Sequence, residues 1–521
     1  MNLVHRECRI RPIMLTMTRR LYLCALLLAA GGVAYAQEPD LGTEEQRAAG
    51  QELYNLKCAH CHGKAGDAMS VATPFLRPTP RDFVSGQYKF RSTASGELPT
   101  TEDIKRSIRL GMPYTSMPAW SGILSDSEIE DLAYYIKTFN GDFAGPYGTP
   151  EVIPVPKAPP YDESLLARGR EVFDANQCAD CHGPNGRGNG PSAPDLMDDW
   201  GEPIRPVDMT KRWTFRGGSS REDIYRTFTT GLNGTPMPSY QQTVEEEDRW
   251  ALVDYVWSLS RQEPEYGTVV PAVGQDRPID VTKGTELFEG VPGTYFPIVG
   301  QIIEPGRSFY PGVNGVEVRA IYNLYEIAFM LSWHDMTAET AGSNSLAMAV
   351  PEPDTVDAAD YTDAVALLLP AQNPQGLERP YFMFGDTDNP MLILYADLGQ
   401  DESGAYLGRG SNSITDTDHP LEHYSNYEDG EWTVIFKTKR VTEGGLEFAE
   451  EAFTPVSFSV WDGASRERGN KRGLSAWYHV YLAPFETESA ALPMAKWAFI
   501  VLVLELGIIG LVRWRNRKRV A

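Results

Sequence analysis

Cys58-Ala59-His60-Cys61-His62 is one of two stretches that decide the fold of the N-terminal half of the chain. The other is Cys178-Ala179-Asp180-Cys181-His182, which lies 120 residues further on. Both have the pattern Cys-x-x-Cys-His, with a histidine directly after the second cysteine. Together they hold four of the six cysteines of the chain.

This pattern is typical of covalent haem attachment of the c type. Two thiols three positions apart can reach the two vinyl groups of one porphyrin, and the adjacent imidazole then lies under the iron. A single copy would also suit half a zinc site or a redox pair, and four cysteines in an exported chain would suit two disulfides. Two copies favour haem, so we expect two covalent haem c groups, attached at Cys58, Cys61 and His62 and at Cys178, Cys181 and His182.

The similarity between the two halves extends well beyond the cysteines. A shift of 120 residues places Glu102-Asp103-Ile104 on Glu222-Asp223-Ile224, and Met117-Pro118 on Met237-Pro238. In both halves 55 residues separate the histidine of the haem motif from this methionine. Such internal repetition indicates a tandem duplication.

Each Met-Pro pair offers a candidate sixth ligand of the iron, Met117 or Met237. A thioether is a soft, neutral donor that stabilises ferrous iron, and the following proline restricts the methionine to extended backbone on a loop. Met112 also precedes a proline, but Gly231-Leu232-Asn233 occupies the corresponding place in the second half. Packing against an aromatic side chain is the alternative role for these methionines.

Apolar spacing predicts helices at residues 43–57, 126–139, 163–177 and 244–259. Gly50 and Gly169 stand where two of these helices could cross closely. Arg91 and Arg216 are candidate partners of haem propionates, because a planar guanidinium pairs with carboxylates in a bidentate manner. A solvated position on the surface is the alternative for both arginines.

These combined motifs resemble class I cytochrome c domains over residues 40–142 and 162–262. The resemblance implies two all-helical domains, each enclosing one covalent haem whose edge is exposed for electron transfer. We expect these domains at residues 37–145 and 163–262.

Proline-rich segments at residues 146–162 and 263–279 read as linkers. After the second linker the apolar pattern changes to strict alternation. The clearest runs are Val316, Val318, Ala320 and Tyr322, then Trp432, Val434 and Phe436. Period two, with Gly, Asn and Asp between the runs, predicts a mostly β sandwich domain over residues 280–488.

Four stretches of this β domain are similar in sequence to one known type of domain. They are residues 316–335, which end in Ser332-Trp333-His334-Asp335, then Tyr381-Phe382-Met383-Phe384-Gly385-Asp386, then residues 456–463, which end in Val460-Trp461-Asp462-Gly463, and finally residues 466–478. These stretches resemble the haem b-binding domain of the ethylbenzene dehydrogenase γ subunit, which is shared by periplasmic complexes of the type II dimethylsulfoxide reductase family. The resemblance implies one haem b with a Met/Lys ligand pair, for which we choose Met383 and Lys471.

The sequence departs from this family in ways that leave other ligands open. Phe384 stands next to Met383 in the methionine register, and Met348 is the next candidate thioether. Arg472 competes with Lys471, although arginine cannot deprotonate to bind iron. His334 or His479 could replace the lysine, and a core methionine with a solvated lysine is the interpretation without haem.

Length and charge narrow the possible functions. The chain has 521 residues, which is too long for one ordinary core. It carries 71 acidic and 47 basic residues, a net charge of -24. Nucleic acid is therefore excluded as a partner, because its binding depends on Lys and Arg that neutralise phosphates.

Both ends of the chain suggest a membrane protein. Arg19 and Arg20 precede an apolar run and the small-x-small pattern Ala34-Tyr35-Ala36, which predicts a signal peptide over residues 1–36. Residues 491–512 are apolar and long enough to cross a bilayer. The basic tail 513–521 should stay in the cytoplasm, so we expect a bacterial inner-membrane protein with one C-terminal span and its main body in the periplasm.

The expected fold is therefore multidomain: two all-α cytochrome c domains, a mostly β sandwich and one transmembrane helix. The function that we expect is electron transfer, without an enzymatic activity of its own, because no nucleophile or acid–base pair stands on a recognisable motif. By resemblance, the partners are molybdenum/iron–sulfur oxidoreductase subunits on one side and a soluble cytochrome or an oxidase on the other. The alternative is a dihaem cytochrome c whose β domain carries no haem and serves ligand binding or scaffolding.

Overall fold

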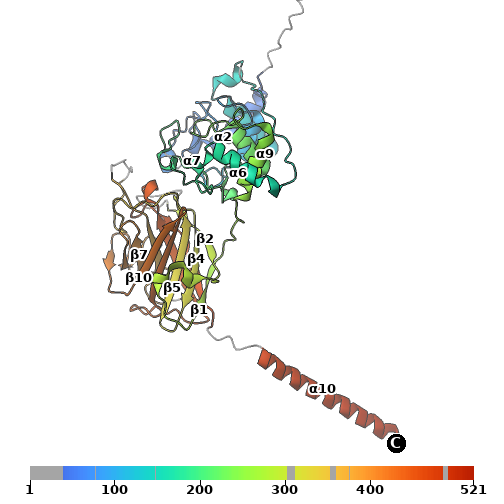
Figure 1. Cartoon of the computed structure of the whole chain (residues 1–521), viewed down its shortest axis with the longest axis vertical. Coiled ribbons are helices and arrows are strands. Elements are labelled where there is room, and N and C mark those ends of the chain that lie inside the picture. The colour runs from blue at the N-terminus through green and yellow to red at the C-terminus, as the bar shows by residue number, and fades with distance from the viewer. Residues whose placement is uncertain are drawn as a thin grey trace, which may run out of the picture.

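The computed structural model describes residues 39–484 and 491–520, apart from residues 77, 147, 203, 302–310, 352–358 and 375. A helical region comes first along the chain, followed by a β domain and a long C-terminal helix (Figure 1). The predicted signal peptide at residues 1–36 lies outside the described residues.

The helical region contains two units of similar plan. The first holds α2 (Glu44–Lys57), α3 (Ala59–His62), α4 (Thr101–Leu110) and α5 (Asp126–Lys137). The second holds α6 (Leu166–Ala175), α7 (Cys178–His182), α8 (Arg221–Thr230) and α9 (Glu246–Ser258). Helices are therefore present in all four predicted segments, and α6 starts a few residues late because a 3-10 turn, Glu163–Leu165, precedes it.

Local sequence explains where several of these helices begin. Thr43, Thr100, Ser125 and Ser220 each form a capping box, in which the hydroxyl accepts the N–H of the third helical residue and that residue's side chain accepts the N–H of the cap. Such caps satisfy donors that the first turn of a helix leaves free. Each capping residue is followed three positions later by Gln, Asp or Glu, which makes these starts readable from the sequence.

In each unit the N-terminal helix crosses the C-terminal helix at a glycine, as the sequence predicts. A Cβ atom on Gly50 would lie 2.0 Å from the carbonyl oxygen of Asp131 in α5. A Cβ atom on Gly169 would lie 2.1 Å from the carbonyl oxygen of Ala251 in α9. Only a residue without a side chain permits this close approach, so the crossing fixes where α3 and α7, which carry the haem motifs, enter each unit.

The β domain is a mixed sheet whose main path runs β10-β11-β5-β4-β1-β14-β12-β6-β7-β8-β9. The first section of this path has β10 (Glu422–Glu428), β11 (Glu431–Lys439), β5 (Glu326–His334), β4 (Gly315–Tyr322), β1 (Val269–Gly274) and β14 (Tyr478–Leu482). The second section has β12 (Phe453–Trp461), β6 (Ala364–Pro370), β7 (Met391–Asp397), β8 (Glu402–Gly408) and β9 (Ile414–Asp416). The short strands β2 (Thr294–Pro297), β3 (Val299–Gly300) and β13 (Gly473–Leu474) lie off this path.

This arrangement differs from a simple sandwich of two antiparallel sheets. Strand β12 pairs with β14 through Phe453–Val456 and with β6 through Ser457–Trp461, so that one strand joins the two sections. Strand β1 lies parallel to both β14 and β4. One large core of buried apolar side chains, including Phe329, Leu367 and Phe458, draws on both sections. The period-two pattern shows which side chains enter that core, but it carries no signal for a strand shared between two sections.

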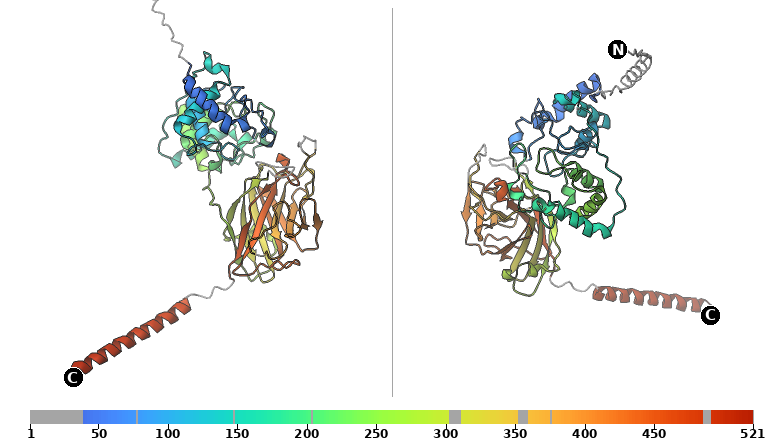
Figure 2. Two further views of the ribbon diagram at one scale, coloured as in Figure 1. Left: turned by 180° about the vertical axis from the view of Figure 1, so that it is seen from behind. Right: turned by 45° about the horizontal axis from the view of Figure 1, so that its top comes forward.

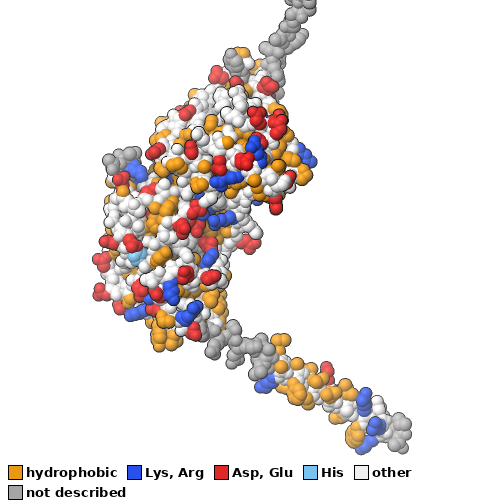
Figure 3. Space-filling model, viewed as in Figure 1, with side chains coloured by type: hydrophobic (Ala, Val, Ile, Leu, Met, Phe, Trp, Pro, Cys, Tyr) orange, Lys and Arg blue, Asp and Glu red, His pale blue; other side chains and the backbone are white. Residues whose placement is uncertain are grey.

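The C-terminal helix α10 (Ala491–Val520) extends away from the rest of the chain (Figure 2). Its segment Met494–Lys518 is long and apolar enough to cross a membrane, and among the described residues it alone meets that criterion of length and composition. Apolar side chains cover its length, and basic side chains gather toward its C-terminal end (Figure 3). The predicted span at residues 491–512 falls within this helix.

Candidate haem-binding site

Both Cys-x-x-Cys-His stretches line one cavity of about 920 Å³. The walls come from both helical units, and the β domain contributes a further part that includes His334 and Asp335. Met117 and Met237 also line this cavity. The structure therefore brings the eight motif residues predicted from the sequence to a single site.

Each motif histidine is oriented by a hydrogen bond to a backbone carbonyl. Nδ1 of His62 lies 3.0 Å from the carbonyl oxygen of Arg81, and Nδ1 of His182 lies 3.4 Å from that of Val207. Because a carbonyl only accepts, Nδ1 must carry the proton, and the Nε2 lone pair is left free to bind a metal. Burial lowers the pKa of both imidazoles, which keeps them neutral, as iron ligation requires.

The four cysteines of the motifs form no disulfide with one another. All four are partly buried, and burial raises the pKa of the Cys58 thiol to about 12 and that of the Cys178 thiol to about 11. At neutral pH both thiols are therefore protonated in the absence of a bound group.

The two Met-Pro loops have the same hydrogen bonds. The N–H of Met112 donates to the carbonyl of Met117 at 3.0 Å, and the N–H of Leu232 donates to that of Met237 at 3.1 Å. In addition, the Thr115 and Thr235 hydroxyls accept from the N–H of Met117 and Met237. Met112 therefore occupies the position of Leu232, as the 120-residue shift indicates, and both of these residues also line the cavity.

Each Met-Pro loop packs tightly against the end of the preceding helix. At Gly231, where φ is +69°, an added Cβ would lie 2.6 Å from backbone atoms of Pro238 and Ser239. Gly111, with φ of +63°, meets Met117 and Pro118 in the same way. A glycine is needed at this helix end because φ is positive and because a side chain would collide with the Met-Pro loop. This explains why the glycine recurs in both halves.

Arg91 is buried away from both the solvent and the cavity. This arginine is 1% exposed, so it is not solvated, and it does not belong to the residues that line the cavity. Its guanidinium instead donates to the carbonyls of Ala94, Thr230 and Gly231, at 3.1, 2.8 and 3.1 Å. Arg91 therefore joins the first unit to the C-terminal end of α8 in the second unit.

Arg216 is one of the residues that line the cavity, and it keeps an accessible surface. Partial burial of its guanidinium lowers its pKa. Arg81, Lys89 and Lys211 line the same cavity, and burial lowers the pKa of both lysines to about 8. The sequence analysis missed these three cations, although Lys89 belongs to the same Lys-Phe-Arg stretch as Arg91.

The candidate haem b ligands are buried to different degrees. Met383 is 2% exposed, whereas Lys471 is half-buried, and neither lines the large cavity. Arg472 is fully buried, with its guanidinium 3.8 Å from the centre of the Phe384 ring and donating to the carbonyl of Phe382 at 3.0 Å. Arg472 is thus a basic residue that contacts the segment around Met383.

The two histidines that could replace the lysine as haem b ligand contact other residues. His334 lines the cavity of the two cytochrome motifs, 3.6 Å from Asp208 of the second helical unit. Nε2 of His479 lies 3.3 Å from Nη2 of Arg379, from which it accepts a hydrogen bond. A histidine held in this way has no free lone pair for iron.

Comparison with known proteins identifies the helical region. Residues 166–260 match the family described as Cytochrome c, and residues 45–136 match the family described as Cytochrome C oxidase, cbb3-type, subunit III. A protein of Haloferax mediterranei, whose name assigns it provisionally as the respiratory nitrate reductase heme subunit ORF7, is 25% identical over 219 residues, which are 42% of this chain and 72% of the relative.

Two further proteins are similar to parts of this chain. The cbb3-type cytochrome c oxidase subunit FixP of Azorhizobium caulinodans is 27% identical over 214 residues, 41% of this chain and 59% of that subunit. A chain of the reducing HAO-like protein complex of Kuenenia stuttgartiensis is 39% identical, with 43% of this chain and 100% of that chain covered and a TM-score of 0.40. The helical region therefore carries cytochrome c domains, which imply covalent haem c, and the chain is related to haem subunits of respiratory complexes.

Proposed function

We propose that the chain is a membrane-anchored multihaem cytochrome, with two haem c groups and one haem b in the β domain, that carries electrons between a partner oxidoreductase and a respiratory chain. The observation that supports this most directly is that one cavity of about 920 Å³ is lined by both motif histidines, His62 and His182. A c-type haem supplies one-electron chemistry, since its iron alternates between the ferric and ferrous states. Sites that share a cavity are neighbours, as a pair of electron carriers must be.

Different side chains of this protein would attach each haem, bind its iron and neutralise its propionates. Cys58 and Cys61 would attach one haem and Cys178 and Cys181 the other, and the side chains of His62, Met117, His182 and Met237 would bind the irons. The carbonyls of Arg81 and Val207 orient the histidines. Arg216, Arg81, Lys89 and Lys211, which are among the cations that line the cavity, would neutralise propionate charges.

For the partner, we propose a molybdenum/iron–sulfur oxidoreductase, with a soluble cytochrome or an oxidase on the other side of the electron path. Two observations support this choice: the resemblance of the β domain to a haem b-binding subunit of such complexes, and the name of the Haloferax relative. We assign the chain no reaction of its own, because an iron with two protein ligands leaves no position for a substrate.

We further propose that α10 anchors the chain in a bacterial inner membrane, with the helical region and the β domain in the periplasm. The segment Met494–Lys518 has the length and composition of a span. The basic residues after Val512 favour a cytoplasmic C-terminus. The helical region and the β domain, which are acidic and would carry the covalent haems, would then lie on the side of the membrane opposite to the C-terminus.

A second candidate function differs only in the β domain. In that reading the β domain holds no haem and serves as a platform on which the second helical unit docks. The buried guanidinium of Arg472 favours this second function. That group packs on the ring of Phe384 and donates a hydrogen bond to the carbonyl of Phe382, next to Met383. Contacts such as Arg205 to Asp462 and Arg187 to Glu431 hold the two parts together.

Haem analysis of the purified full chain tests both proposals. We expect a pyridine haemochrome assay to give two c-type haems that stay bound through acid–acetone extraction. The double variant Cys58→Ser/Cys61→Ser should keep one of them. An extractable b-type haem would favour the first reading of the β domain, and its absence the second. Intact free thiols at Cys58 and Cys178 in mass spectrometry would refute the cytochrome proposal.

A further inference from the structure

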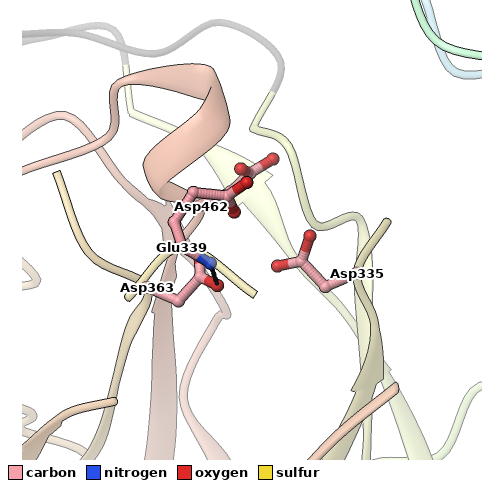
Figure 4. Close-up of side chains that lie close together, drawn as sticks. All are labelled: Asp335, Glu339, Asp363 and Asp462. Carbon is pink, nitrogen blue, oxygen red and sulfur yellow. Dashed lines mark hydrogen bonds between the residues drawn. The ribbon is translucent and has the colours of Figure 1, made fainter. Parts of the chain in front are cut away.

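Four carboxylates meet at one end of the β domain, apart from the residues assigned to haem: Asp335, Glu339, Asp363 and Asp462 (Figure 4). One oxygen from each lies within 4.8 Å of those from the other three. Asp335 directly follows β5, Asp363 directly precedes β6, and Asp462 directly follows β12. Strands β6 and β12 are paired at this end, whereas β5 belongs to the other section of the sheet. The cluster therefore bridges the two sections.

Asp335 is the member of the cluster that lacks a partner. It is 3% exposed, and neither of its carboxylate oxygens accepts a hydrogen bond from the residues that the structure describes. Figure 4 shows this side chain directed toward the other three carboxylates. Oε2 of Glu339 is likewise buried without a hydrogen-bond donor. Buried carboxylate oxygens are costly unless a donor, a cation or a proton satisfies them.

The other two carboxylates are held firmly in place. Asp363 accepts hydrogen bonds from the indole of Trp432 at 3.0 Å and from the N–H of Gly463 at 2.8 Å. Asp462 forms a bidentate pair with Arg205 of the second helical unit, at 2.8 and 3.2 Å. The guanidinium of Arg205 carries one positive charge against the four carboxylates of the cluster.

We propose that Asp335, Glu339, Asp363 and Asp462 bind one Ca²⁺ ion. Calcium takes six to eight oxygen ligands at about 2.3–2.6 Å, so ligand oxygens on opposite sides of one ion lie about 5 Å apart. That span matches the 4.8 Å within which the four oxygens lie. Magnesium needs a tighter octahedral shell at about 2.0–2.1 Å and keeps several waters, while zinc and copper prefer nitrogen and sulfur ligands.

The ion would fasten together segments that are distant in the sequence. It would tie the end of β5 to β6 and β12, and thus one section of the sheet to the other. Through Asp462 and Arg205 it would also brace the contact with the second helical unit. The site does not depend on the proposed electron-transfer function, because none of its four carboxylates is a haem ligand.

Calcium binding to the purified full chain tests this proposal. After removal of metal with a chelator, we expect equilibrium dialysis with radioactive Ca²⁺ to give one tightly bound ion per chain, which equal Mg²⁺ does not displace. The double variant Asp335→Asn/Glu339→Gln should bind Ca²⁺ about 100-fold more weakly or not at all, the upper end of what loss of supporting side chains costs a metal site. Asp416→Asn, an exposed carboxylate on β9, is the matched control and should bind as wild type.

Thermal unfolding provides a second measurement. Ca²⁺ should raise the melting temperature of the wild-type chain and of Asp416→Asn, because an ion that binds only the folded state stabilises it. The double variant should show no such shift. If that variant does not fold, the wild-type stoichiometry still decides. A folded wild-type chain that retains no Ca²⁺, or infrared bands showing Asp335 and Asp363 protonated with Ca²⁺ present, would overturn the proposal.

Discussion

Replacing Arg91 by methionine distinguishes an arginine that joins two units from one that binds a haem propionate. Methionine keeps much of the volume but removes the three hydrogen bonds to Ala94, Thr230 and Gly231. The carbonyl of Ala94 also accepts the N–H of Glu97, and that of Gly231 accepts the hydroxyl of Thr230. The substitution therefore leaves mainly the Thr230 carbonyl, at the end of α8, without a hydrogen-bond donor.

The magnitude follows from these contacts. A buried carbonyl left without a donor costs about 1–3 kcal/mol, and each hydrogen bond to a charged group contributes about 1.5–3 kcal/mol. Part of this is recovered, because burial disfavours the charged guanidinium and lowers the pKa of Arg91 to about 10. We expect a net destabilisation of about 2–4 kcal/mol, which lowers the melting temperature of a region of this size by roughly 5–15 °C.

Arg216→Met is the matched control, because Arg216 lines the cavity and no hydrogen bond of its guanidinium is recorded in the described part of the chain. Its loss should leave stability nearly unchanged but lower a haem potential, since reduction adds negative charge and the cation favours it. A charge roughly 10 Å away at an effective dielectric of 20 contributes about 1.7 kcal/mol, or about 70 mV for one electron.

Two assays on the full chain separate these effects: thermal unfolding followed by circular dichroism, and a potentiometric titration followed in the Soret band. The Arg91 variant should melt earlier at an unchanged potential, and the Arg216 variant should show the reverse. An Arg91 variant that melts like wild type while its potential falls would refute the interface role drawn from the structure.

Four further outcomes are expected. Met117→His or Met237→His should lower the potential of one haem and halve the near-infrared band of methionine-ligated ferric haem, and an unchanged band in both would point to Met112 instead. Burial disfavours the charged form of Asp40, but the hydroxyl of Thr101 and the charge of Lys137 outweigh this effect and lower the pKa of Asp40. The ionised carboxylate therefore stabilises the fold above the ordinary pKa of 3.8, and this stabilisation is lost as the pH falls below that value. The acid-unfolding profile of Asp40→Asn should lack this part of the loss in stability. If the β domain holds haem b, Met383→Ala and Lys471→Ala should each convert it from low to high spin in the full chain, and unchanged spectra would exclude this pair. A periplasm-dependent reporter should be active when fused near residue 490 and silent after residue 521, and activity at the latter position would reverse the topology.

The parts of the fold that were predictable depend on local chemistry. Capping at Thr43 or Ser220, the crossing at Gly50 and the Met-Pro loops all involve residues close together in the sequence or repeated at one interval. The repeat also resolves Met112 against Met117, since Leu232 takes the equivalent place in the second half. A duplicated sequence thus acts as an internal control. A residue type that both copies keep at one position serves a structure or function that the two units share.

The errors arise where the two copies differ in their surroundings. Arg91 and Arg216 both follow a phenylalanine, but Arg91 stands ten residues before α4 and Arg216 only five before α8. Arg91 consequently turns toward the other unit, whereas Arg216 turns to the cavity. No feature within either short stretch indicates which of these surroundings the guanidinium will meet, because the partners at Thr230 and Gly231 lie about 140 residues away.

The same limit explains why the carboxylate cluster is absent from the sequence-based expectations. Asp335, Asp363 and Asp462 each look like an ordinary polar residue at the end of an apolar strand, where such residues commonly begin a turn. Only the topology, in which β5 ends beside β6 and β12, makes them neighbours. Their charge is then partly balanced by Arg205, which is 257 residues from Asp462 in the chain. A buried carboxylate is unfavourable alone and favourable beside a cation. Three strand ends and one loop residue that each tolerate an acid therefore become a binding site only when the fold assembles them.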